Sequence, residues 1–231
     1  MTTIYDVFIL CGGKCGSSSL STSFKKLGLK TLKVHGRLDY IEQFKEDKLY
    51  ECINNSSKHK PVIIIDVYRT PIERKISSFF QNIHKDIPDW KSKSIDQLIN
   101  EFNNKYFYIL EEYHSINEAF ENYNIPFFNE FNFKRKLNYL KKDNKLFIKL
   151  LYKDIKEWNK ILTVFFNQPF IISNNNMSNK KEYYQTYQQF LSKYKVPKSY
   201  FDKLEKDREF KIYNTKEDQE TYLKYWKSRC Y

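Results

Sequence analysis

A short glycine-rich loop brings together backbone and side chains that could bind an anion. All five glycines of the chain lie in its first 36 residues, and three of them stand with Lys14 in the segment 12–16. In a chain so poor in glycine, this clustering predicts backbone that does not tolerate a Cβ atom. Three serines at 17–19 follow and open a predicted helix. Backbone N–H groups at such a helix start, together with a lysine, are typical of a phosphate site.

The order of residues in this loop differs from that of the nucleoside-triphosphate loop. That loop ends in Gly-Lys followed by Ser or Thr, whose hydroxyl binds Mg²⁺. Here Lys14 precedes the last glycine of the loop, Gly16. The order therefore indicates a phosphate site of another kind, and a tight turn without a ligand stays the alternative.

A second candidate anion site follows a second apolar run. The run Val62–Val67 predicts a buried strand, and Arg69 comes two residues after it. Pro71 fits the first position of the next helix, and Ser77 lies eight residues beyond Arg69, two turns into that helix. An arginine fork and a hydroxyl could bind one phosphate between them. Taken alone, the pair is more typical of a surface arginine and a solvated serine.

Taken together, the two segments resemble motifs of the sulfotransferase superfamily, enzymes that use 3′-phosphoadenosine 5′-phosphosulfate. The stretch VFILCGGKCGSSSL is similar to their first motif, which has Lys, a small residue, Gly, two hydroxyl residues and a hydrophobic residue two places on. The stretch VIIIDVYRTPIERKISSFF is similar to the second motif, in which Ser follows Arg after eight residues. The residues that fit the two motifs in register are Lys14, Cys15, Gly16, Ser17, Ser18 and Leu20, then Arg69 and Ser77.

The later part of the chain narrows this resemblance. The segment LFIKLLYKDIKEWNKILTVFF is similar to a late strand and helix of the superfamily, with Lys153 where Glu is usual. The segments NMSNKKEYYQTY and DREFKIYNTKEDQETYLKYW resemble the capsular polysaccharide synthesis proteins, a sulfotransferase-like family of bacteria and giant viruses. The resemblance covers nearly the whole chain, and the two phosphate motifs are its specific part.

The resemblance implies a co-substrate, a reaction and a role for each motif. The reaction would be transfer of a sulfuryl group from 3′-phosphoadenosine 5′-phosphosulfate to a hydroxyl, expected to belong to a carbohydrate or polysaccharide, with no metal. Lys14 would neutralise the charge that builds on the leaving oxygen. The loop amides and Ser17–Ser19 would hold the 5′-phosphate, and Arg69 and Ser77 the 3′-phosphate.

A base for the acceptor hydroxyl is sought among the four histidines, His35, His59, His84 and His114. His35 ends the predicted strand 31–35, and open α/β sheets place their sites at the C-terminal ends of strands. Related sulfotransferases use a His or a Glu as base, and His35 best matches the family position. A structural histidine at a strand end is the alternative.

The elements that must position these residues alternate along the chain. Apolar runs and helical periodicity predict strands over 4–11, 31–35, 61–67 and 145–151, and helices over 17–27, 38–54, 71–84, 94–122, 154–166, 179–194 and 215–229. Such alternation indicates an α/β fold with a central parallel sheet flanked by helices. With the phosphate loop, it predicts a P-loop-like three-layer fold in one domain over 1–231, with 170–231 as a helical C-terminal extension.

The net charge and the order of residues around Lys14 bear on two alternative functions. The chain has 40 Lys and Arg against 28 Asp and Glu, a net charge of +12, and the stretch 134–160 holds ten basic residues against three acids. This charge suits an anionic ligand. A non-catalytic nucleic-acid-binding protein is one alternative, but the basic residues are dispersed without a recognition motif, so no nucleic-acid partner is expected. A nucleotide-dependent phosphotransferase is the other, and the order of residues around Lys14 argues against it.

The lengths of the apolar segments and the absence of a leader pattern indicate in which cellular compartment to expect the protein. Purely apolar stretches such as Val7–Cys11 and Val62–Ile65 are far shorter than the roughly 18–20 residues of a membrane span. The first residues lack the basic region and apolar core of a secretory leader. We therefore expect a cytoplasmic protein without a membrane span, in which Cys11, Cys15, Cys52 and Cys230 are free thiols.

Overall fold

The computed structural model describes residues 3–107, 115–173 and 181–230. By the contacts among its residues, the chain divides into two compact units. The first unit is built from Met1–Arg69 and Glu112–Asn176, and the second from Thr70–Glu111 and Met177–Tyr231. Each unit has hydrophobic core residues of its own.

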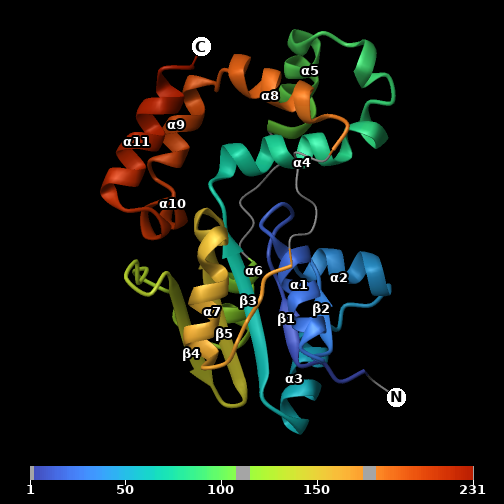
Figure 1. Ribbon diagram of the computed structural model, residues 1–231, viewed down its shortest axis with the longest axis vertical. Helices are drawn as coiled ribbons and strands as arrows, with labels where there is room; N and C mark the ends of the chain where they lie inside the picture. The colour runs from blue at the N-terminus through green and yellow to red at the C-terminus, as the bar shows by residue number, and fades with distance from the viewer. Residues whose placement is uncertain (1–2, 108–114, 174–180, 231) are drawn as a thin grey trace. The chain divides into compact units, whose positions relative to one another are not determined.

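A five-stranded sheet forms the centre of the first unit (Figure 1). Its strands are β1 (Val7–Ile9), β2 (Thr31–Lys33), β3 (Val62–Tyr68), β4 (Leu137–Lys142) and β5 (Lys145–Leu151), in the spatial order β2-β1-β3-β5-β4. The first three neighbouring pairs are parallel, whereas β4 pairs antiparallel with β5. The predicted α/β class is therefore confirmed, with a sheet that is mostly parallel.

The antiparallel strand β4 differs from the sequence prediction, which placed no strand there. Of its residues only Leu137 is buried, and the others are half-buried or exposed, so β4 lacks the continuous apolar run of β3. A two-residue turn joins it to β5, with Asp143 in the left-handed conformation (φ 52°) that hairpin turns favour. Lysines on this edge strand also disfavour pairing with another chain.

Helices cover both faces of the sheet, because β1 and β3 bury side chains on both sides. In β1, Val7 and Ile9 point to one face and Phe8 to the other. The helices on the face of Val7 are α1 (Ser17–Lys26) and α7 (Trp158–Phe166), and those on the face of Phe8 are α2 (Arg37–Phe44), α3 (Leu49–His59) and α6 (Ser115–Asn122). The first unit thus consists of three layers: helices, sheet and helices.

The segment 38–54, predicted as one helix, forms parts of α2 and α3 instead. Lys45 adopts the left-handed conformation (φ 59°) and ends α2. The residues between the two helices include no Gly or Pro that would mark the break in the sequence, so the helical pattern continues across it.

The second unit is helical in its described part. Its helices are α4 (Pro71–Asp86), α5 (Ile95–Phe102), α8 (Tyr184–Lys193), α9 (Lys198–Leu204), α10 (Arg208–Tyr213) and α11 (Lys216–Lys227), with a 3₁₀ turn over Trp90–Ser92. The rings of Phe79, Phe102 and Phe190 contact one another in its core. Many of the aromatic residues that are abundant in the sequence therefore serve packing here.

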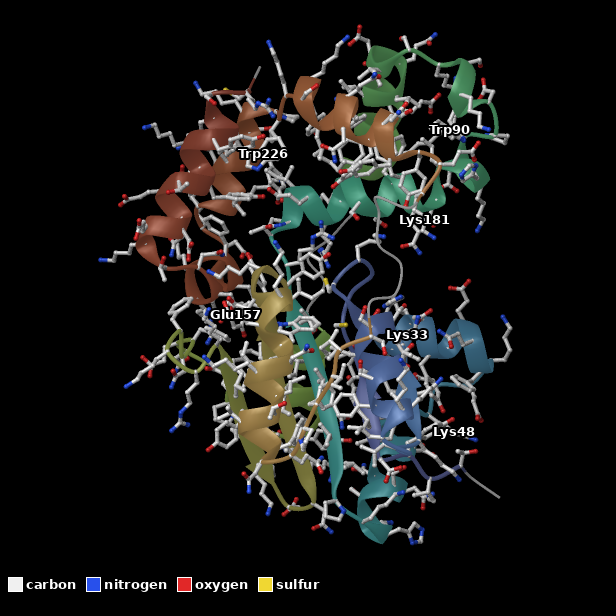
Figure 2. The ribbon with its side chains drawn as sticks, viewed as in Figure 1. Lys33, Lys48, Trp90, Glu157, Lys181 and Trp226 are labelled. Carbon is white, nitrogen blue, oxygen red and sulfur yellow. The ribbon has the colours of Figure 1, made fainter. Side chains whose placement is uncertain are left out.

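A carboxylate ties two helices of the second unit together. Glu73, in the first turn of α4, accepts hydrogen bonds from the Tyr222 hydroxyl (2.8 Å) and from Trp226 Nε1 (3.1 Å). Both donors belong to α11, and Trp226, labelled in Figure 2, is buried. A polar contact on the indole and the phenol satisfies donors that would otherwise be costly to bury.

Helix boundaries in the second unit depart from the sequence prediction in two places. The segment 94–122 is divided into α5, a π-helical turn over Asn103–Phe107 and, in the first unit, α6, while residues 108–114 lie outside the described residues. The helices α9 and α10 were not predicted. Both are short, which leaves too few turns for a helical pattern, and α10 begins after Asp207, whose carboxylate accepts the Phe210 N–H.

Candidate functional site

The glycine-rich loop connects β1 to α1, as expected for a phosphate loop. Gly16 precedes the first residue of α1 and has a left-handed backbone (φ 84°, ψ 10°). Its carbonyl oxygen accepts the first helical hydrogen bond, from Leu20 N–H (3.1 Å). Lys14 is also left-handed, with φ 67°, an uncommon conformation for a residue with a side chain. Two left-handed residues within three positions give the loop its sharp turn into the helix.

Gly16 is required for two independent reasons. Its positive φ disfavours any other residue, and a Cβ atom added to it would lie 2.9 Å from a ring carbon of Trp158. Trp158 is fully buried and donates its indole N–H to the Leu151 carbonyl (3.1 Å). By contrast, a Cβ on Gly13 would meet no atom within 4 Å, so the expectation that the clustered glycines exclude a Cβ is met at Gly16 and not at Gly13.

Arg69 lies against this loop. It follows β3, the parallel neighbour of β1, and its Nη1 donates a hydrogen bond of 2.6 Å to the Lys14 carbonyl oxygen. Its guanidinium also stacks over the ring of Tyr152, with 4.4 Å from Cζ to the ring centroid. The structure therefore brings together Lys14 and Arg69, which the sequence assigned to two separate motifs.

The loop serines and cysteines are held close to the end of β1. Ser17 and Ser19 are buried, whereas Ser18 is half-exposed. The Ser17 side chain hydrogen-bonds to the thiol of Cys11, and burial raises the pKa of that thiol well above its ordinary value. Cys11 is therefore a neutral packing residue at neutral pH, since reactive cysteines need a lowered pKa.

Cys15 has the environment of a small core residue. It is buried, and its thiol donates to the carbonyl oxygen of Gly13, with 3.6 Å between the atoms. Cys15 thus fits the small position that the resemblance assigns to it. All four cysteines lie in the described residues and have free thiols.

His35 also contacts the backbone at the start of the loop. Its Nδ1 lies 2.7 Å from the carbonyl oxygen of Cys11. A carbonyl can only accept, so we assign the proton to Nδ1, which leaves Nε2 without a proton in the neutral imidazole. The predicted strand 31–35 is shorter in the structure, where β2 ends at Lys33 and His35 follows it. The backbone N–H of His35 donates to the Asp39 carboxylate (2.6 Å), which fixes the segment that carries the ring. His35 thereby has the tautomer of a base at Nε2.

The other candidate residues come from α3, from α4 or from outside the described residues. Ser77 is buried in α4 and belongs to the second unit, whereas Arg69 is the last residue of a first-unit segment. His84, near the end of α4, accepts a hydrogen bond from Trp90 Nε1 (3.1 Å), a packing role in the second unit. His59 ends α3 and is exposed, and His114 lies outside the described residues.

A buried ion pair beside the site was missed from the sequence. Lys149 Nζ lies 2.6 Å from Asp66 Oδ2, and the two side chains are 1% and 3% exposed. They face each other on β5 and β3, where Asp66 pairs in register with Lys149. A single charge within each apolar run was the sequence signal that could have indicated this pair, because buried charges need partners.

Comparison of the chain with protein-family models, with curated protein sequences and with solved structures finds no match. Within the described ranges, no helix is long and apolar enough to cross a membrane. The same residues contain no group of three or more His, Cys, Asp or Glu side chains that could hold a metal ion.

Proposed function

We propose that the chain is a sulfotransferase that moves a sulfuryl group from 3′-phosphoadenosine 5′-phosphosulfate to a hydroxyl of a carbohydrate or polysaccharide. The observation that carries this proposal is the convergence of Arg69 and His35 on the loop that contains Lys14. Arg69 contacts the Lys14 carbonyl, and His35 contacts the Cys11 carbonyl. The resemblance to the two sulfotransferase motifs gives the loop its ligand, and the P-loop-like description of the fold is part of the same proposal.

Each group has a chemical role in this reaction. The acceptor hydroxyl attacks sulfur, its proton passes to Nε2 of His35, and the bond from sulfur to the bridging phosphate oxygen breaks. Adenosine 3′,5′-bisphosphate leaves with the electron pair of that bond. The ammonium of Lys14 would stabilise the negative charge that develops on the bridging oxygen.

The nucleotide would be held by its two phosphates. The loop amides and the hydroxyls of Ser17, Ser18 and Ser19 would bind the 5′-phosphate at the start of α1. Arg69 and Ser77 would bind the 3′-phosphate, as the resemblance implies. A guanidinium has five N–H donors, so the bond from Arg69 to the Lys14 carbonyl leaves further donors on the same fork for a phosphate.

The basic stretch 134–160 supports the nucleic-acid alternative less than its composition suggests. Lys149 is buried against Asp66, and Lys136 pairs with Glu157 and Asp154. Lys142 donates to backbone carbonyls. Several of the charges counted in the sequence are thus engaged within the first unit, so the sulfotransferase proposal is preferred.

Comparative calorimetry tests the proposal. We expect adenosine 3′,5′-bisphosphate to bind more tightly than AMP, by about tenfold or more, because one charged hydrogen bond contributes about 1.5–3 kcal/mol. ATP with Mg²⁺ serves as the comparison for a phosphotransferase. Equal affinity for AMP and the bisphosphate, or tighter binding of ATP with Mg²⁺, would contradict the proposal.

A further inference from the structure

The geometry points to a brace, formed by Arg69 and Tyr152, that holds the phosphate loop in its anion-binding shape. In this inference Tyr152 is a positioning residue that acts through Arg69 on the peptide between Lys14 and Cys15. The ligand part of the inference rests on the proposed function, because it takes the loop to bind the 5′-phosphate. Neither of the two sequence motifs includes Tyr152 or assigns a role to it.

The bond from Arg69 fixes the orientation of one peptide group in the loop. Its Nη1 lies 2.6 Å from the Lys14 carbonyl oxygen, so that carbonyl points towards the guanidinium. In a trans peptide the C=O and the following N–H point in opposite directions, so the N–H of Cys15 points away from Arg69. Lys14 has φ 67°, which few residues with side chains adopt without support. The hydrogen bond supplies that support.

Tyr152 in turn fixes the guanidinium. The last registered pair of β3 and β5 is Tyr68 with Leu151, so Arg69 and Tyr152 are the first residues after the ends of two adjacent parallel strands, and Tyr152 begins a 3₁₀ helix over Tyr152–Glu157. The guanidinium lies 4.4 Å from the centre of the Tyr152 ring. A planar cation on an aromatic face is held in orientation as well as attracted. The register of the sheet therefore sets the direction of the arginine fork.

The segment after β5 contacts the loop a second time, at the start of α7. Trp158, six residues beyond Tyr152, lies under Gly16 and leaves no room for a Cβ there. Tyr152 and Trp158 thus act at the two left-handed residues of the loop, Lys14 and Gly16. Because both left-handed residues are supported from outside the loop, the loop would keep its shape without a bound anion.

Amide hydrogen exchange tests the brace without a ligand. In Tyr152→Leu, we expect exchange in a peptide covering 11–17 to become about tenfold faster than in the parent, since the loop opens locally. Tyr152→Phe keeps the ring and should exchange like the parent. Tyr225→Leu is the matched control, because it removes an arginine–tyrosine stack of the same kind, with Arg229, in the second unit.

AMP affinity is the second measurement, because AMP carries only the 5′-phosphate. We expect Tyr152→Leu and Arg69→Ala each to weaken the binding of AMP about tenfold. The double variant should lose no more AMP affinity than Arg69→Ala alone. Tyr152→Phe should bind AMP like the parent. An Arg69→Ala variant that loses affinity for the bisphosphate but not for AMP would overturn the brace and leave Arg69 as a 3′-phosphate ligand.

The outcomes separate this inference from the proposed function. Unchanged exchange over 11–17 in Tyr152→Leu overturns the brace, and so does an increase that extends equally to β3, which would indicate general destabilisation. A parent protein that binds neither AMP nor the bisphosphate contradicts the proposed function, and the exchange experiment still decides whether the brace exists. An increase confined to 11–17 and absent from Tyr152→Phe supports it.

Discussion

At the scale of the residue, the loop after β1 depends on contacts that come from distant parts of the chain. Lys14 and Gly16 have backbones that few sequences favour, and each is fixed from outside the loop, by Arg69 and by Trp158 respectively. The sequence pattern indicated Lys14, Gly16 and Arg69 because motif spacing is local. It could not indicate Tyr152 or Trp158, because their contacts exist only once β5 lies beside β3.

The base is the residue on which the proposed chemistry is most directly tested. His35→Ala should lower turnover about 10²–10⁴-fold and leave the dissociation constant of adenosine 3′,5′-bisphosphate nearly unchanged, because Nε2 faces the acceptor in the proposed reaction. The hydrogen bond from Nδ1 to the Cys11 carbonyl would hold the ring ready for this role. Steady-state kinetics with an accepted sugar substrate and calorimetry measure the two quantities.

His59→Ala is the control for that experiment, since His59 is an exposed residue at the end of α3. It should retain the turnover of the parent. If His35→Ala turns over like the parent, the base is another residue.

At the scale of the element, the sequence predicted the strands with a strong apolar pattern and missed the elements with a weak one. β3 and β5 were located well because each is a mostly apolar run, with one buried charge in it, between polar segments. β4 was missed because an edge strand needs little apolar surface, and α9 and α10 because a helix of two turns shows no periodicity. Element boundaries set by one left-handed residue, such as Lys45, also leave no signal in hydrophobicity.

The ion pair between β3 and β5 gives an energetic prediction for the sheet. Lys149→Met should lower the free energy of unfolding by about 3–5 kcal/mol, because it leaves the Asp66 carboxylate buried without its ammonium partner. The double variant with Asp66→Leu should recover much of that loss, since two apolar groups of similar volume can replace a buried pair. Urea denaturation measures both.

Lys136→Met is the matched control, because it breaks a lysine–carboxylate pair near the surface of the same unit. Lys136 pairs with Glu157, whose side chain is 49% exposed and which is labelled in Figure 2. The expected loss of stability is small, because a solvent-exposed ion pair contributes little to folding. Equal losses of unfolding free energy in Lys149→Met and Lys136→Met would show that the buried pair with Asp66 contributes no more to stability than the surface pair.

At the scale of the whole molecule, the chain joins a sheet-centred unit to a helical unit, and each is assembled from two stretches of sequence. The sequence predicted one domain over 1–231 with a helical extension over 170–231. The helices α8, α9 and α11 share a hydrophobic core with α4 and α5, which come from the middle of the chain. This grouping depends on contacts between residues far apart in the sequence, which local patterns do not show.

The separate hydrophobic cores predict that the two units can unfold independently. Phe190 is fully buried in the aromatic core of the second unit, and Phe190→Ala should cost about 3–5 kcal/mol there. If the two units unfold separately, amide exchange will accelerate in α4, α5 and α8 while β1 and β3 keep the protection of the parent. Phe147→Ala, a fully buried position in β5, is the matched variant and should produce the reverse pattern. If either variant accelerates exchange equally in both units, the chain unfolds as the single cooperative domain that the sequence predicted, and the separate cores have no thermodynamic independence.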